Sequence, residues 1–286
     1  MKSALLAALV AIPNPLPTTL PHFQGAPATP HAITATKAPQ NPFLARDPNS
    51  NIHNDTWMTD AYRRRGPLGT SPTAFSGTMA PALCGSLTFH SRGFIVTVCP
   101  ALGAGPQARV IDPDTLDVLA TYDLPTVPDP PGTKTYQNFS GGGYFFLDHL
   151  DRIWVATKTN HIFVLSIAPD GRGISLAHDY TNTGLASDDR ISSALPGFRG
   201  STWFVSKQGN VGILHRGGKL KLLRLRESVQ NSFAVDRSGV YVVSSKRMYR
   251  LVSRRGCPAW RGRSATATRG SSSRARPRPA RARRLR

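Results

Sequence analysis

A hairpin pattern that recurs four times between residues 86 and 252 constrains this chain more than any other feature. In each copy a run of apolar residues leads into a short turn, and a second apolar run follows. Apolar runs on both sides of turns that contain Asp or Gly predict β-hairpins. The four predicted turns occupy residues 90–93, 148–151, 197–200 and 236–239.

The spacing of these turns indicates a repeat of four-stranded units. The turns begin at residues 90, 148, 197 and 236, which gives intervals of 58, 49 and 39 residues, and a blade of four strands takes roughly 40–50 residues. Third strands are predicted at 161–165, 210–214 and 247–252, and fourth strands at 116–124, 174–180 and 219–225. Such units cannot bury both faces alone and stack into a ring. We therefore predict an all-β fold, a β-propeller of four-stranded blades, with about four recognisable units of an expected six.

The composition changes abruptly after Ser253. Residues 254–286 hold twelve arginines and no acidic residue, so the formal net charge of +20 belongs mostly to this segment. We interpret it as a disordered tail that is an out-of-frame reading of GC-rich coding sequence, which would end the fourth unit after its third strand and truncate the propeller. The alternative is a genuine basic arm that binds nucleic acid or anionic surfaces through counterion release.

The N-terminal region predicts export. Residues 1–12 place one lysine before about ten apolar residues, which is too short for a membrane span and typical of a signal-peptide core. A degenerate, disordered N-terminus is the alternative. Residues 1–48 would form this segment and a lead-in rich in Pro, Thr and Ala, and residues 49–253 the partial propeller. We expect a secreted or extracytoplasmic protein without a membrane span, monomeric if its ring is intact.

Two cysteines flank the first predicted hairpin. Counting inward from its turn, Phe89 faces Phe94, Leu87 faces Val96 and Cys84 faces Cys99. Opposed residues of antiparallel strands lie close enough for a disulfide, and a disulfide suits an exported protein. We predict a bond between Cys84 and Cys99, with two free thiols in a reducing cytoplasm as the alternative.

Chemical motifs are scarce in this sequence. It has no phosphate-binding loop before a helix, no zinc spacing of Cys and His, and no nucleophile elbow. His149, His161, His178 and His215 fall at turns or strand edges, where we expect surface residues.

A metal site in the central channel is the remaining candidate. Asn138 and Asn231 precede innermost strands, and Asn54 and Asp55 would join them if residues 51–62 pack over the channel mouth. Oxygen ligands of this kind suit Ca²⁺ or Mg²⁺. Alternatively, the asparagines satisfy backbone groups at turns, a common role for Asn.

The fourth unit also carries a family resemblance. Residues 231–242, Asn-Ser-Phe-Ala-Val-Asp-Arg-Ser-Gly-Val-Tyr-Val, are similar to the Pro-Asn-Gly-x-Ala-x-Asp-x-x-Gly-x-x-Tyr-Val blade of gluconolactonase and regucalcin-like propellers and their strictosidine synthase-like relatives. In the lactonase families an Asn at this place is a metal ligand, a role that the resemblance implies for Asn231. Here Gln-Asn-Ser replaces Pro-Asn-Gly, and no Glu matches the first metal-binding carboxylate. Over residues 41–252 the chain also resembles uncharacterised exported propeller proteins of high-GC actinobacteria, which implies fold and compartment.

Three functions follow from these observations, in order of preference. The first is an exported propeller that binds a ligand or a protein partner across its loop-rich face. The second is a divalent-metal-dependent, lactonase-like hydrolase with the metal in the central channel. The third is binding of nucleic acid or anions through the basic tail, which export argues against.

Overall fold

The computed structural model describes residues 37–46, 53–61, 84–99, 105–128, 141–181 and 184–265. All regular structure in these ranges is β-strand, arranged as four antiparallel sheets of four strands each. The chain divides into two compact units, Met1–Lys37 and Ala38–Arg286, and all four sheets belong to the second. The predicted all-β propeller of four-stranded blades is therefore confirmed.

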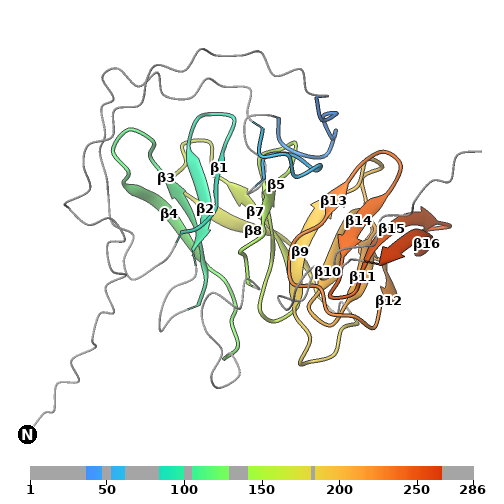
Figure 1. The fold of residues 1–286 in the computed structure, drawn as a ribbon. Helices are drawn as coiled ribbons and strands as arrows, with labels where there is room; N and C mark the ends of the chain where they lie inside the picture. The colour runs from blue at the N-terminus through green and yellow to red at the C-terminus, as the bar shows by residue number, and fades with distance from the viewer. Residues whose placement is uncertain are drawn as a thin grey trace, which may run out of the picture. The chain divides into compact units, whose positions relative to one another are not determined.

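Each sheet is a meander of four consecutive strands, here called blades one to four (Figure 1). Blade one comprises β1 (Leu87–Phe89), β2 (Ile95–Cys99), β3 (Gln107–Ile111) and β4 (Val118–Asp123). Blade two comprises β5 (Phe146–Leu147), β6 (Ile153–Ala156), β7 (Ile162–Ile167) and β8 (Ile174–Tyr180). Blade three comprises β9 (Ile191–Pro196), β10 (Thr202–Ser206), β11 (Asn210–Leu214) and β12 (Leu220–Arg224). Blade four comprises β13 (Ala234–Val235), β14 (Val240–Val243), β15 (Arg247–Arg254) and β16 (Cys257–Ala265).

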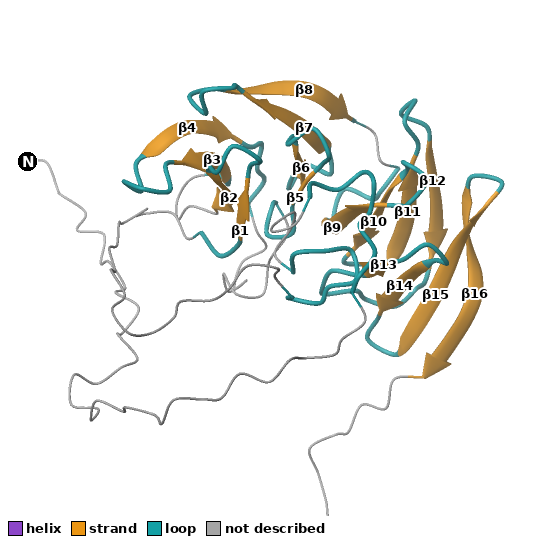
Figure 2. Ribbon diagram, turned by 90° about the horizontal axis from the view of Figure 1, so that it is seen from above, coloured by secondary structure: helices purple, strands orange, loops and turns teal. Residues whose placement is uncertain are grey.

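The blades follow one another in chain order and pack face to face (Figure 2). One buried apolar cluster joins blades one and two through residues such as Val98 and Val155, and a larger cluster joins blades two, three and four through residues such as Phe204 and Tyr249. Strands such as β9 and β10 are buried on both faces, whereas β4, β8 and β12 contain no fully buried residue. The predicted fourth strands are confirmed at these three positions.

The first turns of blades one to three differ from the four-residue turns that we predicted. Gly93, Asp151 and Gly200 each have a positive φ, of 97°, 57° and 82°, which is typical of three-residue hairpin loops that end in a left-handed residue. In blade one the loop comprises residues 91–93, because the His90 N–H donates to the Phe94 carbonyl. Pairing of His90 with Phe94 shifts the register by one, so Leu87 pairs with Thr97 and Phe89 with Ile95. The predicted pairing of Leu87 with Val96 is wrong for this reason.

The predicted disulfide between Cys84 and Cys99 is confirmed, with 4.3 Å between the two Cα atoms. Cys84 precedes β1, and Cys99 ends β2, where its side chain is fully buried. The bond therefore fixes the open end of the first hairpin. Cys257 is a free, exposed cysteine.

Blade four continues beyond the point where we predicted its end. β15 runs past Ser253 to Arg254, the chain turns at Arg255 and Gly256, and β16 returns along β15. Both turn residues have positive φ, 50° and 77°, as a two-residue type I′ turn requires. The predicted stop after the third strand is wrong, because composition alone hid a strand whose Trp260 packs on the ring of Tyr249 at 4.9 Å. Residues 266–286 of the proposed tail lie outside the described residues.

A short segment of the expected lead-in is also packed. Residues 41–45, which we call the strap, cross the ends of β5 and β9. The side-chain amide of Asn41 donates to the Pro196 carbonyl at 2.8 Å, the Ala45 N–H donates to the Leu147 carbonyl at 2.9 Å, and Leu44 is 3% exposed. Packing thus begins before residue 49, the expected boundary, because Leu44 completes the core between these two strands. Residues 1–12, on which the signal-peptide prediction rests, lie outside the described residues.

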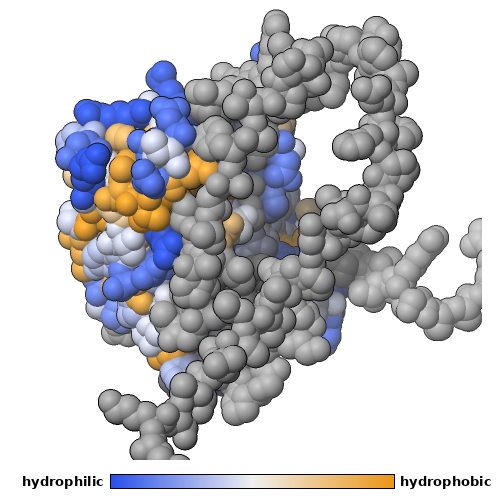
Figure 3. Space-filling model, turned by 90° about the vertical axis from the view of Figure 1, so that its left-hand side faces the viewer, coloured by the Kyte–Doolittle hydropathy of each residue, from blue (hydrophilic) through white to orange (hydrophobic). Residues whose placement is uncertain are grey.

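The surface carries scattered apolar side chains among hydrophilic ones, as one face shows in Figure 3. Among the described residues, the exposed large apolar side chains are Leu87, Val118, Leu150, Leu176, Val243, Met248 and Trp260. In the part of the chain that the structure describes, no helix is long and apolar enough to cross a membrane.

Candidate functional site

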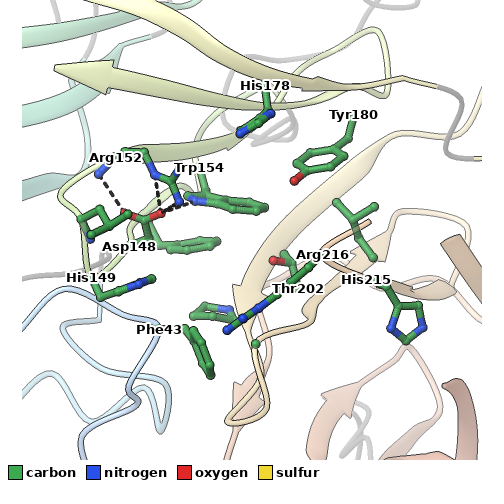
Figure 4. Close-up of a pocket in the computed structure, with 15 residues that line it drawn as sticks. Phe43, Asp148, His149, Arg152, Trp154, His178, Tyr180, Thr202, His215 and Arg216 are labelled. Carbon is green, nitrogen blue, oxygen red and sulfur yellow. Dashed lines mark hydrogen bonds and ion pairs between the residues drawn. The ribbon is translucent and has the colours of Figure 1, made fainter. Parts of the chain in front are cut away.

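A cavity of about 260 Å³ lies between blades two and three (Figure 4). Its walls come from the β5–β6 turn, the β9–β10 turn, the β11–β12 turn, the end of β8 and the strap. The site thus forms where turns and strand ends of two blades meet, so no single stretch of the sequence contains it. The lining residues are Phe43, Phe146, Asp148, His149, Leu150, Arg152, Trp154, His178, Tyr180, Pro196, Gly200, Thr202, Leu214, His215 and Arg216.

Asp148 is the only carboxylate in this lining, and its oxygens are fully used by neighbouring groups. One oxygen accepts the backbone N–H groups of Leu150 and Arg152 at 2.9 and 3.0 Å. The other accepts the indole N–H of Trp154 at 2.9 Å and two guanidinium nitrogens of Arg152 at 2.8 and 2.7 Å. Asp148 is 3% exposed, and a buried charge needs such partners. The group therefore fixes the turn and the Trp154 ring, and the charge of Arg152 is neutralised.

Aromatic rings form one wall of the cavity. Phe146 and Trp154 are cross-strand partners whose rings stack at 5.6 Å, and Trp154 stacks in turn on Tyr180 at 5.8 Å. His178 continues the series, with its ring 6.0 Å from that of Tyr180. Because alternate residues of a strand share a face, His178 and Tyr180 both lie on the cavity side of β8, and Figure 4 shows them above Trp154.

Arg216 supplies an unneutralised positive charge on the opposite side. It follows β11, and its guanidinium carbon lies 4.8 Å from the centre of the Phe43 ring, a cation–π contact. A Cβ at Gly200 would lie 2.6 Å from an Arg216 nitrogen and 2.9 Å from the Phe43 ring. Gly200, which also has a positive φ, therefore leaves room for this stack. Within the described residues, the Arg216 guanidinium has no acceptor and the Tyr180 hydroxyl has no hydrogen-bond partner.

His215 is held by its neighbours at the edge of the cavity. Its Nε2 atom lies 2.8 Å from the Gly256 carbonyl oxygen and its Nδ1 atom 3.4 Å from the Ser201 hydroxyl. A carbonyl can only accept, so Nε2 carries a proton and donates to the Gly256 carbonyl. His149 and His178 are exposed, as predicted for surface residues, and His215 is half-buried; all three line this cavity. These histidines come together only because two blades pack side by side, and no local sequence pattern indicates this packing.

Two serines near the predicted ligand Asn231 join the innermost strands of blades three and four. Ser193 and Ser232, at the start of neighbouring innermost strands, share a hydrogen bond of 2.7 Å. Tyr144 lies beside them, and burial raises the pKa of its hydroxyl although a hydrogen bond with the backbone of Ser232 acts in the opposite direction. Asn231, next in sequence to Ser232, is exposed.

The other predicted metal ligands have turn-forming roles. Asp55 accepts the Trp57 N–H at 2.8 Å and the Thr59 hydroxyl. Asn54 has a φ of 67° and donates to the Ala61 carbonyl, which matches the alternative role that we gave to these asparagines. Asn138 lies outside the described residues. No group of three or more His, Cys, Asp or Glu suited to a metal ion occurs among the residues that the structure describes, and the metal site stays a prediction.

Comparisons with known proteins add little to this description. No protein-family model matches the chain, and no curated protein matches it. Among solved structures, it is similar to the crystal structure of a protein from Lactobacillus plantarum, with 7% identity and a TM-score of 0.45 over 64% of this chain. The match covers 55% of that protein, so the chain spans little more than half of its length. A likeness this distant supports no inference about function, and the fold assignment rests on the four sheets of the chain itself.

Proposed function

We propose that this protein is a binding protein for a small molecule, which it holds in the cavity between blades two and three. The observation that supports this most directly is the pairing of a stacked aromatic wall with unpartnered donors. Ligand sites in proteins are mostly apolar cavities with a few polar groups that fix the orientation of the ligand. The rings of Phe146, Trp154 and Tyr180 provide the apolar part, and Arg216 with the Tyr180 hydroxyl provides the polar part.

Binding without chemistry fits the polar groups of this cavity better than catalysis does. The one lining carboxylate, Asp148, is saturated by hydrogen bonds and has no free lone pair for a general base. The Ser201 hydroxyl, which lies 3.4 Å from His215, is not among the residues that line the cavity. We therefore propose recognition rather than turnover as the function.

We also propose that binding takes place outside the cytoplasm. The Cys84–Cys99 disulfide supports this, because disulfides persist in oxidising compartments. Fractionation of cells and alkylation of thiols in the native protein test it. Recovery in the cytoplasm with both cysteines alkylated would contradict the proposal.

Ligand-observed NMR with a library of small fragments tests the binding function on the full chain. We expect fragments that compete for one site and that lose at least about tenfold in affinity in Tyr180→Ala, because a stacking face is removed. His161→Ala is the matched control, since His161 pairs with Asp179 at 3.0 Å in the same sheet but does not line the cavity. Circular dichroism verifies that both variants are folded. Fragment affinities that are equal in the two variants would refute the proposed site.

A further inference from the structure

We infer that the ligand of this cavity is a planar aromatic carboxylate with a single negative charge. This inference rests on the proposed binding function and adds the chemical class of the ligand. It follows from the charges, the ring faces and the volume of the cavity.

The charges select an anion. Asp148 and Arg152 neutralise each other through direct contacts at 2.7 and 2.8 Å, so neither attracts a ligand charge. Arg216 is then the remaining arginine of the lining, and its guanidinium keeps its donors available. Guanidinium groups bind carboxylates through two parallel N–H···O bonds. A cationic ligand would meet Arg216 and find no free carboxylate among the lining residues, and one guanidinium matches one negative charge.

The rings select a flat ligand. The planes of Phe146 and Trp154 differ by 15°, those of Trp154 and Tyr180 by 23°, and those of His178 and Tyr180 by 27°. These near-parallel rings give the wall a common orientation, and a further ring gains most when it lies parallel and offset to such faces. A puckered aliphatic ring of the same charge would make fewer close contacts with this wall.

The volume limits the size of the ligand. At about 260 Å³ the cavity lies just below the roughly 300–1,000 Å³ of sites for drug-sized molecules. It therefore suits one ring system with a short carboxylate substituent. The Tyr180 hydroxyl, which Figure 4 shows directed toward the interior, can donate to the carboxylate or to a ring substituent.

Three matched probes test the class of ligand on the full chain: benzoate, benzamide and cyclohexanecarboxylate. Benzamide keeps the shape of benzoate without its charge, and cyclohexanecarboxylate keeps the charge without the flat ring. We expect benzoate to bind about tenfold more tightly than benzamide, as a charge-assisted hydrogen bond at a partly exposed site would give. Cyclohexanecarboxylate should bind several-fold more weakly than benzoate. Affinities are read from chemical-shift changes or calorimetry.

Two arginine variants assign the preference to one side chain. Arg216→Gln should weaken benzoate about tenfold and leave benzamide unchanged, since only the charged probe uses the guanidinium. Arg199→Gln removes the same charge from the β9–β10 turn, where Arg199 is exposed and does not line the cavity, and should change neither affinity. Benzamide binding as tightly as benzoate, or equal effects of the two variants, would overturn the anionic class while leaving the binding function intact. No binding by any of the three probes would overturn the proposed ligand class, and the fragment screen then decides whether the cavity binds small molecules.

Discussion

Asp148→Asn should lower the free energy of unfolding by about 3 kcal/mol at neutral pH. Asparagine keeps the shape of the side chain, and its carbonyl oxygen can still accept the backbone N–H groups of Leu150 and Arg152. Its NH₂ group, however, would face the Trp154 indole N–H and the Arg152 guanidinium, which now contact the second carboxylate oxygen at 2.7–2.9 Å. Three donor contacts would become repulsive, and the charge of Arg152 would lose its partner.

The size of this effect follows from burial. The side chain of Asp148 is 4% exposed and that of Arg152 is 25% exposed. Removing one partner of a buried ion pair costs about 3–5 kcal/mol, and partial exposure of the arginine places the loss near the lower end. Asp236→Asn is the matched control, because Asp236 begins the corresponding turn of blade four and accepts hydrogen bonds from Ser238, Gly239 and Tyr241 without a salt bridge. For Asp236→Asn we expect the free energy of unfolding to fall by about 1 kcal/mol.

Urea denaturation followed by circular dichroism and tryptophan fluorescence measures both variants. The midpoint should fall while the slope with denaturant stays constant, since the surface exposed on unfolding is unchanged. A loss below 1 kcal/mol for Asp148→Asn, or equal losses in the two variants, would refute the claim that Asp148 organises this turn through its charge.

Three further predictions concern stability. Replacing Cys84 and Cys99 by serine should lower the free energy of unfolding by about 3 kcal/mol, because the disulfide closes a loop of 15 residues. The urea midpoint of the wild-type protein should fall by the same amount on reduction, and an unchanged midpoint would contradict this prediction. Gly209→Ala should cost at least about 2 kcal/mol, because Gly209 has a φ of 80° and a Cβ there would lie 1.9 Å from a backbone carbonyl oxygen. Gly217→Ala, with nothing within 4 Å of its Cβ, should leave the free energy of unfolding nearly unchanged in the same urea denaturation, and similar losses at both positions would argue against this packing. Burial alone would raise the pKa of Asp236, but hydrogen bonds from the turn that follows lower it below the usual value. The stability that this carboxylate contributes is therefore present above about pH 4 and is lost as pH falls through its lowered pKa. The urea midpoints of wild type and Asp236→Asn should thus converge in acid, and a difference between them that does not change with pH would contradict this prediction.

Local patterns were sufficient to predict the blades. Alternation of apolar runs with Asp or Gly turns located most inner and middle strands, because both signals act within a few residues. Register was not predictable at this level. Whether a turn has two or three loop residues depends on a left-handed residue such as Asp151, which the sequence does not distinguish from an ordinary turn aspartate.

Features that depend on contacts between distant segments were missed. β16 was hidden because the run Arg261, Gly262 and Arg263 resembles the basic tail. Its antiparallel pairing with β15 and the Tyr249–Trp260 contact show that it belongs to the sheet. The cavity was hidden for the same reason. Trp154 and Arg216 lie on different blades, and nothing in either local sequence indicates that they share a site.

The strap has a consequence for the order of folding. The hydrogen bond from Asn41 to Pro196 joins residues 155 positions apart, whereas each blade forms from neighbouring hairpins. Closing so long a loop costs more conformational entropy than forming any hairpin turn. The contacts that offset this cost can form only after β9 has formed. The strap should therefore dock last, and the same few contacts should be among the first to open in the native state. Since Phe43 of the strap forms part of the cavity wall, such an opening would admit a ligand without disturbing any blade.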